Sequence, residues 1–118
     1  MLRNIRNRAA ARLETQAAVF AALGDQTRLA LVVRLSGGQP RSISELTTGS
    51  RLTRQAITKH LRVLEGAGMV RSSRAGRESL YELSPEPIDE IREYLDFVAQ
   101  KWDHALERLK RFVEDYGV

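Results

Sequence analysis

Side chains able to bond to nucleic acid are concentrated between Arg51 and Arg77. This stretch carries seven basic residues and one acid, Glu65, so its net charge of +6 exceeds the +4 of the whole chain. Four of its polar residues recur at positions i, i+3, i+4 and i+7, a spacing that places them on one face of a helix. These residues are Gln55, Thr58, Lys59 and Arg62. An α-helix fits the major groove of B-DNA, where such side chains bond to base edges and phosphates.

Two kinds of contact with duplex DNA are expected from this stretch. Base edges are the predicted contacts of Arg54, Gln55, Thr58 and Lys59. Phosphates are the predicted contacts of Thr53 and Arg62. Arg74 and Arg77 are expected at the backbone or in the adjacent minor groove, where narrow A/T tracts attract Arg. The alternative is that the helix face is simply solvated and that the two arginines only add solubility.

Helix caps mark the elements that must position these side chains. Ser42 and Glu45 have the S-x-x-E form of a capping box, which predicts a short helix over about 43–48. A Gly-Ser-Arg turn follows, and Thr53 can cap the next helix. This order predicts a helix-turn-helix over about 42–67.

The second of these helices is expected to have one core face and one free face. Its apolar stripe consists of Ile57, Leu61 and Leu64. After it, two stretches rich in β-formers, 69–74 and 77–83, flank a glycine-containing turn at Ala75-Gly76. The sequence therefore predicts a two-stranded wing over about 69–83.

The segments before the helix-turn-helix are expected to be helical from residue 13. Residues 1–12 hold four Arg and no acid, and we interpret them as a basic tail or arm that is either solvated, extends the first helix or touches phosphates. Phe20 lies on the first helix, and Asp25 can cap the second. The second helix carries Leu29, Val32, Val33 and Leu35 on a largely apolar surface, which predicts a central, buried element.

A long C-terminal helix is predicted over about 85–116. Ser84-Pro85 gives a cap with Pro at the first helical position. Apolar residues then recur at alternating spacings of three and four, as in a coiled coil. They are Ile88, Ile91, Leu95, Val98, Trp102, Ala105, Leu109, Phe112 and Tyr116, widened by Tyr94, Leu106 and Val113. A small domain is not expected to cover so wide a surface from within.

The composition limits the class of protein. A chain of 118 residues is long enough for one domain with a modest core, here 13–118 behind the basic segment. The absence of Cys excludes disulfides and thiolate metal sites, and a reducing cytoplasm is the expected location. No apolar run approaches the roughly 20 residues that span a bilayer, so no membrane association is expected.

Two motifs resemble those of a known family. Thr53-Arg-Gln-Ala-Ile-Thr-Lys-His-Leu61, followed by Val63-Leu-Glu-Gly-Ala-Gly-Met-Val70, resembles the recognition helix and following turn of ArsR/SmtB-type winged helix-turn-helix regulators. Phe20-Ala-Ala-Leu-Gly-Asp-Gln-Thr-Arg-Leu29 is similar to the opening segment of that family. The resemblance covers about residues 15–83 and implies a homodimer joined through its first and last helices. The expected interface residues are Phe20, Ile91, Leu95, Val98, Trp102, Leu106, Leu109 and Phe112.

The chain departs from this family where classical members sense metals. It has no Cys, and His104-Ala-Leu-Glu107 resembles only half of the site that other members build on the last helix. We therefore expect no metal and no cofactor, with His104 and Glu107 as the alternative for a weak metal site. His60 is expected to pack or bond locally. Tyr94, Phe97 and Trp102 could line a pocket for an unknown small-molecule effector, although an aromatic stripe of this kind is usually core or interface.

The expected fold is mainly α with a small β-hairpin, a winged helix-turn-helix that dimerises through its first and last helices. The expected function is a homodimeric transcriptional regulator, a repressor, on a near-palindromic duplex operator. One alternative is a metal-responsive regulator. Another is a winged-helix module that binds protein or RNA, although the reading face has no aromatic residue on which unpaired bases could stack. An enzyme is not expected, because the chain has no Cys and no Gly-rich phosphate loop.

Overall fold

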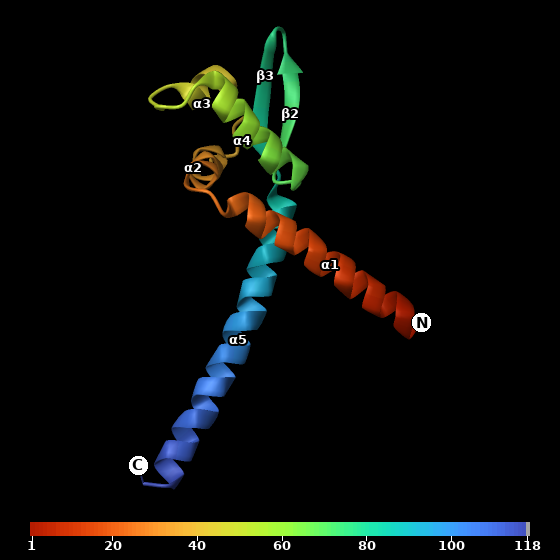
Figure 1. Ribbon diagram of the computed structural model, residues 1–118, viewed down its shortest axis with the longest axis vertical. Coiled ribbons are helices and arrows are strands. Elements are labelled where there is room, and N and C mark those ends of the chain that lie inside the picture. Colours follow the sequence, from red (N-terminus) through yellow and green to blue (C-terminus); the bar gives the residue numbers. More distant parts are fainter. Residues whose placement is uncertain (118) are drawn as a thin grey trace. The chain divides into compact units, whose positions relative to one another are not determined.

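The computed structural model describes residues 1–117, which fold mainly into helices with a small antiparallel sheet (Figure 1). The predicted winged helix-turn-helix is confirmed. The chain divides into two compact units, Met1–Ile88 and the part of the last helix that begins at Asp89. The elements are α1 (Leu2–Leu23), α2 (Gln26–Leu35), β1 (Arg41–Ser42), α3 (Ile43–Thr47), α4 (Arg54–Gly66), β2 (Val70–Ala75), β3 (Glu78–Leu83) and α5 (Pro85–Asp115).

The predicted capping box at the start of α3 is present. The Ser42 hydroxyl accepts a hydrogen bond from the Glu45 backbone N–H at 3.1 Å, and a Glu45 carboxylate oxygen accepts from the Ser42 backbone N–H at 3.3 Å. Two orphan amides of a five-residue helix are satisfied in this way. The cap therefore specifies where the first helix of the helix-turn-helix begins.

The same carboxylate makes the cap sensitive to acid. The Ser42 backbone N–H, assisted by the Arg41 guanidinium 3.4 Å away, lowers the pKa of Glu45 below its ordinary value. A carboxyl group with a lowered folded-state pKa stabilises the fold at pH values above its unfolded pKa. That contribution is lost as the pH falls through the folded value.

Glu45→Gln is expected to flatten the acid dependence of stability. Gln can complete a capping box but does not titrate, so the variant keeps the hydrogen bond and loses the proton linkage. Urea unfolding followed by circular dichroism should show the variant losing stability less steeply than the wild type below about pH 4.3, the ordinary Glu value. Parallel pH profiles for the two proteins would contradict this assignment.

The sheet has three strands in the order β1-β3-β2, all antiparallel, where the sequence predicted a two-stranded wing. The additional strand pairs Arg41 with Tyr81 and Ser42 with Leu80. A strand of two residues is too short to show an alternating pattern, which explains why the sequence did not predict it. Its effect is to tie the start of α3 to the middle of β3.

Helix α4 buries the predicted apolar stripe. Ile57, Leu61 and Leu64 are 2%, 0% and 0% exposed. They lie in a core to which α1, α2, α3, β2 and β3 also contribute apolar side chains. The other buried apolar residues of this unit are Val19, Ala22, Leu31, Leu35, Leu46, Met69, Val70 and Tyr81. With this face in the core, the face that carries Gln55, Thr58, Lys59 and Arg62 lies outside it.

Helix α2 buries only part of its predicted apolar surface. Leu31 and Leu35 point into the core, whereas Leu29 is 49% and Val33 72% exposed. Residues two positions apart on a helix lie about 200° apart around its axis, so the pair at 31 and 35 and the pair at 29 and 33 face opposite ways. The expectation that Leu29 and Val33 are buried was therefore wrong.

Helix α1 begins at Leu2, so the basic residues 2–12 extend the first helix. This is one of the conformations considered for the segment, and its contact with phosphates stays a prediction. Among residues 1–117 no helix combines the length and the apolar character needed to cross a bilayer.

Candidate nucleic-acid interface

The candidate reading helix α4 begins at a side-chain cap. The Thr53 hydroxyl accepts a hydrogen bond from the Ala56 backbone N–H at 3.1 Å, as the sequence predicted. This bond occupies a lone pair of the hydroxyl oxygen and leaves its proton free. Thr53 can therefore cap the helix and still donate to a phosphate.

Replacing Thr53 by Ala should lower the free energy of unfolding by about 1 kcal/mol, the usual effect of removing a Thr or Ser cap. Thr53→Ser should keep most of the wild-type stability, because the capping hydroxyl group is retained. Thermal or urea unfolding at neutral pH measures both. Equal stability of the Ala variant and the wild type would show that the cap contributes nothing.

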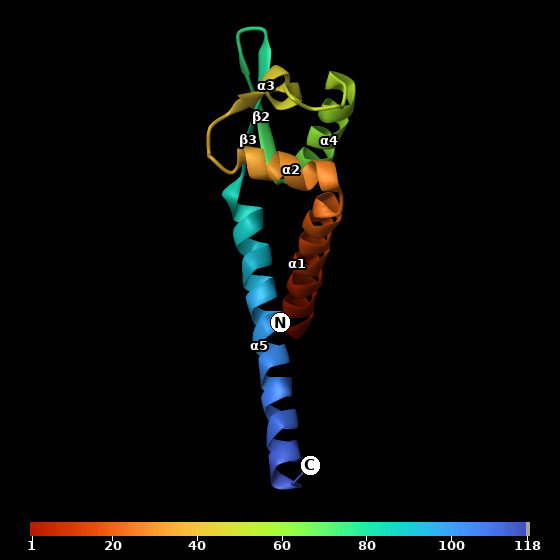
Figure 2. The ribbon, with the colours of Figure 1, turned by 90° about the vertical axis from the view of Figure 1, so that its left-hand side faces the viewer.

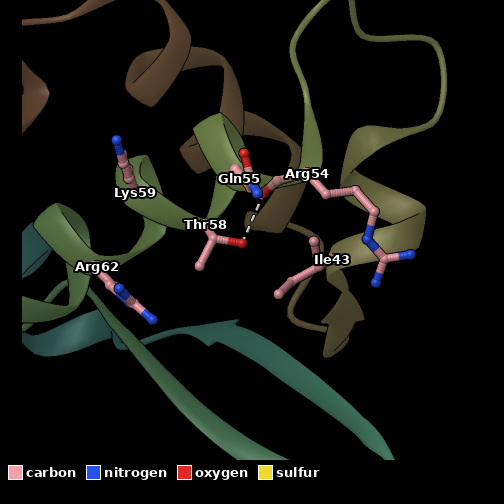
Figure 3. A pocket seen from close by; sticks show the side chains of 6 residues that line it. All are labelled: Ile43, Arg54, Gln55, Thr58, Lys59 and Arg62. Carbon is pink, nitrogen blue, oxygen red and sulfur yellow. Dashed lines mark hydrogen bonds between the residues drawn. The ribbon is translucent and has the colours of Figure 1, made fainter.

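The exposed face of α4 lines a hollow of about 460 Å³ together with Ile43 of α3 (Figure 3). Figure 3 shows Arg54 reaching toward α3, while Lys59 and Arg62 leave the helix in different directions. The lining residues are Ile43, Arg54, Gln55, Thr58, Lys59 and Arg62. Five of these six are residues predicted to contact DNA, and three of them are cations with no acid among them. The structure thus brings the predicted reading set together on one surface.

The Thr58 side chain is constrained by its own helix. Its hydroxyl donates to the Arg54 carbonyl at 2.7 Å, the dashed line in Figure 3. The hydroxyl proton is used in this bond, which leaves the oxygen as an acceptor and the methyl group as an apolar contact. Thr58 can therefore accept from an exocyclic amino group or pack against a thymine methyl group.

A second hollow of about 340 Å³ joins α4 to the wing. Arg54 lines this hollow as well as the first, and Arg77 enters from the hairpin turn. Its other lining residues are Ser42, Ile43, Ser44, Glu78 and Ser79. Arg54 therefore links the exposed polar face of α4 to the wing. A duplex backbone that follows this path meets two guanidinium groups, several hydroxyl groups and the carboxylate of Glu78.

The turn of the hairpin lies one residue later than the sequence predicted. Ala75 pairs with Glu78, so the two-residue loop is Gly76-Arg77 instead of Ala75-Gly76. Gly76 has φ +64° and no other residue of the loop has a positive φ, which is the pattern of a type II′ turn with Gly first. Figures 1 and 2 show the hairpin projecting beyond α2 with this turn at its far end. Arg77 thus lies at the wing tip and Arg74 on the strand beside it.

The wing arginines differ in how far their charge is neutralised. Arg71 donates to Glu82 at 3.0 Å across the hairpin. Within residues 1–117, neither Arg74 nor Arg77 has a carboxylate within ion-pair distance. The full charge of Arg74 and Arg77 is therefore available to an external anion. Arg71, which is paired with Glu82, is a weaker candidate for contact with DNA phosphates.

Several residues of this surface were missed by sequence reasoning. Ile43 carries no polar group, and Ser44, Glu78 and Ser79 join the second hollow only because β1 draws α3 onto the sheet. Arg34 was also missed, although it donates to the Leu46 and Glu45 carbonyls at 2.7 and 2.8 Å and so holds the end of α3. No local pattern distinguishes such residues from ordinary surface positions.

No metal centre lies beside this surface in the described part of the chain. Among residues 1–117 no three His, Asp or Glu side chains gather in a geometry that could hold a metal ion. His60 bonds locally, as expected, because its Nδ1 atom lies 3.2 Å from an Arg28 guanidinium nitrogen. The exposed cations are the chemical feature of this site.

A capped helix with a free polar face, a short preceding helix and a basic hairpin together define a winged helix-turn-helix DNA-binding protein. Comparisons with known proteins place the chain within this class. A helix-turn-helix domain family matches residues 14–73. The HTH-type transcriptional regulator Rv2034 of Mycobacterium tuberculosis is 34% identical over 96 residues, which cover 81% of this chain and 86% of that protein.

Solved structures show the same relationship. An ArsR-like transcriptional regulator from Rhodococcus sp. RHA1 superposes with a TM-score of 0.72 at 35% identity, covering 85% of this chain and 93% of that one. The homodimeric winged helix-turn-helix DNA-binding domain of Mb0332 from Mycobacterium bovis, a possible ArsR-family regulator, has a TM-score of 0.64 at 27% identity, covering 86% of this chain and 90% of that one. The chain belongs to the ArsR/SmtB family of helix-turn-helix regulators. It is a DNA-binding transcriptional regulator, not an enzyme.

Proposed function

We propose that the protein is a homodimeric repressor that binds a near-palindromic duplex operator, with α4 in the major groove. The observation that carries this proposal is the free face of α4, which gathers an amide, a hydroxyl group and three cations in one hollow without an acid. Groups of these kinds bond to base edges and phosphates. A repressor follows from such a protein when its operator overlaps the start of transcription.

The proposed contacts follow the geometry of the surface. Arg54, Gln55, Thr58 and Lys59 contact base edges, and Thr53 and Arg62 contact phosphates. Arg74 and Arg77 on the wing contact the backbone or the adjacent minor groove. Arg54, which lines both hollows, is placed to join the two sets.

The apolar face of α5 supports pairing with a second copy. Six of the predicted interface residues are large apolar side chains that are 44–64% exposed, far more than an isolated chain normally leaves along one helix. They are Leu95, Val98, Trp102, Leu106, Leu109 and Phe112. Ile91 is 7% exposed and Phe20 is half-buried, so these two have less surface to offer a partner.

A two-fold dimer explains how one short helix achieves operator specificity. Two copies of α4 related by a two-fold axis would enter successive major grooves about 34 Å apart, and the operator would repeat the same half-site in opposite orientations. The homodimeric state of the similar Mb0332 domain supports this arrangement.

Titration of the purified protein against the DNA upstream of its own gene tests the proposal. We expect a saturable complex that resists competition by random DNA and contains two chains per site. Addition of zinc should leave it unchanged, because no three metal-ligating side chains gather among residues 1–117. Release of the DNA by zinc would instead favour a metal-responsive regulator that uses His104 and Glu107. Equal affinity for upstream and random DNA would contradict operator specificity.

A further inference from the structure

The Arg28 side chain joins three helices at the base of the reading helix. Its Nε atom donates to the Ala22 carbonyl in the last turn of α1 at 2.6 Å, and one of its terminal nitrogens lies 3.2 Å from Nδ1 of His60 on α4. Its backbone N–H donates at 3.0 Å to the carboxylate of Asp25, the cap of α2. One residue in the first turn of α2 thus connects α1, α2 and α4.

The chemistry of this joint specifies the protonation state of His60. A guanidinium group only donates hydrogen bonds, so Nδ1 of His60 must be the acceptor and must carry no proton. The proton of the neutral ring then lies on Nε2. A proton on Nδ1 would remove the acceptor and place an imidazolium cation 3.2 Å from a guanidinium cation.

Protonation would also disturb the cap of α2. The charged groups that face the ring are Arg28 and Asp25, both from α2, whereas α1 contributes the uncharged Ala22 carbonyl. The Asp25 oxygen that caps α2 lies 3.8 Å from Nδ1 of His60. An imidazolium that turned toward this oxygen would compete with the Arg28 backbone N–H for it. The hydrogen bond between Arg28 and His60 therefore forms only while the His60 ring is neutral.

His60 directly follows Lys59 on α4, and its ring lies on the side of the helix that packs against α1 and α2. A hydrogen bond weakens steeply when its geometry is disturbed, so this bond adds to the packing of Ile57, Leu61 and Leu64 in holding α4 against its support. We infer that Arg28 and His60 are positioning residues for DNA binding: neutral His60 holds α4 in its reading position, and protonation of His60 releases it. This inference rests on the proposed reading of DNA by α4.

The pH dependence of operator preference tests the inference. The ratio of affinities for the upstream fragment and for random DNA, measured by fluorescence anisotropy, should fall as the pH is lowered from about 8 to about 5. His60→Asn should remove most of this fall, since the Asn side-chain oxygen can accept near the position of Nδ1 and does not titrate.

The chain offers a matched control, because it has only one other histidine. His104→Asn, measured with a chelator present, should keep the wild-type pH profile. A His60→Asn profile that follows the wild type would overturn the inference. So would a His104→Asn profile that becomes flat.

Imidazole nitrogen NMR of the wild-type protein provides a readout that does not require DNA. At about pH 8 the His60 ring should be the tautomer with the proton on Nε2. A proton on Nδ1 would contradict the hydrogen bond from Arg28 to His60 and overturn the inference, even if DNA binding were specific. Failure of the wild type to prefer upstream DNA at any pH, with the expected tautomer present, would contradict the proposed function and leave the joint standing.

Discussion

Trp102→Glu is expected to convert the protein to monomers and to lower its affinity for an operator by a factor of about 10² to 10⁴, the usual gain from linking two binding units. Trp102 is 64% exposed on α5 and lies on the apolar stripe proposed to pair with a second copy. An aromatic side chain of this size buries roughly 150–250 Å² in an interface. Transfer of an uncompensated carboxylate into the same place costs several kcal/mol, and a two-fold dimer incurs that cost twice.

Analytical ultracentrifugation and DNA titration measure the two effects separately. The matched control is Gln100→Glu, which adds the same charge to an exposed position on α5 outside the apolar stripe. That variant should stay dimeric and bind the operator. A Trp102→Glu protein that sediments as the wild-type dimer would contradict the placement of Trp102 in the interface.

Gln55→Ala is expected to weaken binding to the operator while leaving binding to random DNA nearly unchanged. Gln55 lines the hollow of about 460 Å³ on the exposed face of α4. A bidentate contact with a base contributes about 1–3 kcal/mol of discrimination against the wrong base. Arg77→Ala should weaken binding to both kinds of DNA. It should also reduce the slope of log affinity against log salt by about 1, since Arg77 lies at the wing tip and is assigned to the backbone.

The two variants serve as controls for each other, because each has an expected effect that the other lacks. Salt titrations on operator and random fragments with both proteins complete the comparison. Equal losses on both fragments for Gln55→Ala would contradict the division between base-reading and phosphate-binding residues.

The helix-turn-helix was predictable because its signals are local. The capping box of Ser42 and Glu45, the cap at Thr53 and the stripe of Ile57, Leu61 and Leu64 each lie within a few residues of the element they specify. Each of these features is present in the structure. The residues that line the reading hollow were predictable for the same reason, since one helix supplies five of the six.

Features that depend on contacts between distant segments were not predictable. Strand β1 has two residues and exists because Arg41 and Ser42 pair with Tyr81 and Leu80, about 40 positions away. The joint between Arg28 and His60 spans 32 positions and has no periodic signal. The exposure of Leu29 and Val33 on α2 was not predicted, because an apolar residue type does not indicate which neighbour covers it.

Two copies of α4 are proposed to read an operator with two-fold symmetry. Hydroxyl-radical footprinting of the wild-type protein on the DNA upstream of its gene tests this symmetry. Two protected half-sites in inverted orientation are expected, with centres about one helical turn or roughly 34 Å apart, and both should be weakened in Gln55→Ala. Protection of one half-site alone, or uniform protection without symmetry, would contradict it.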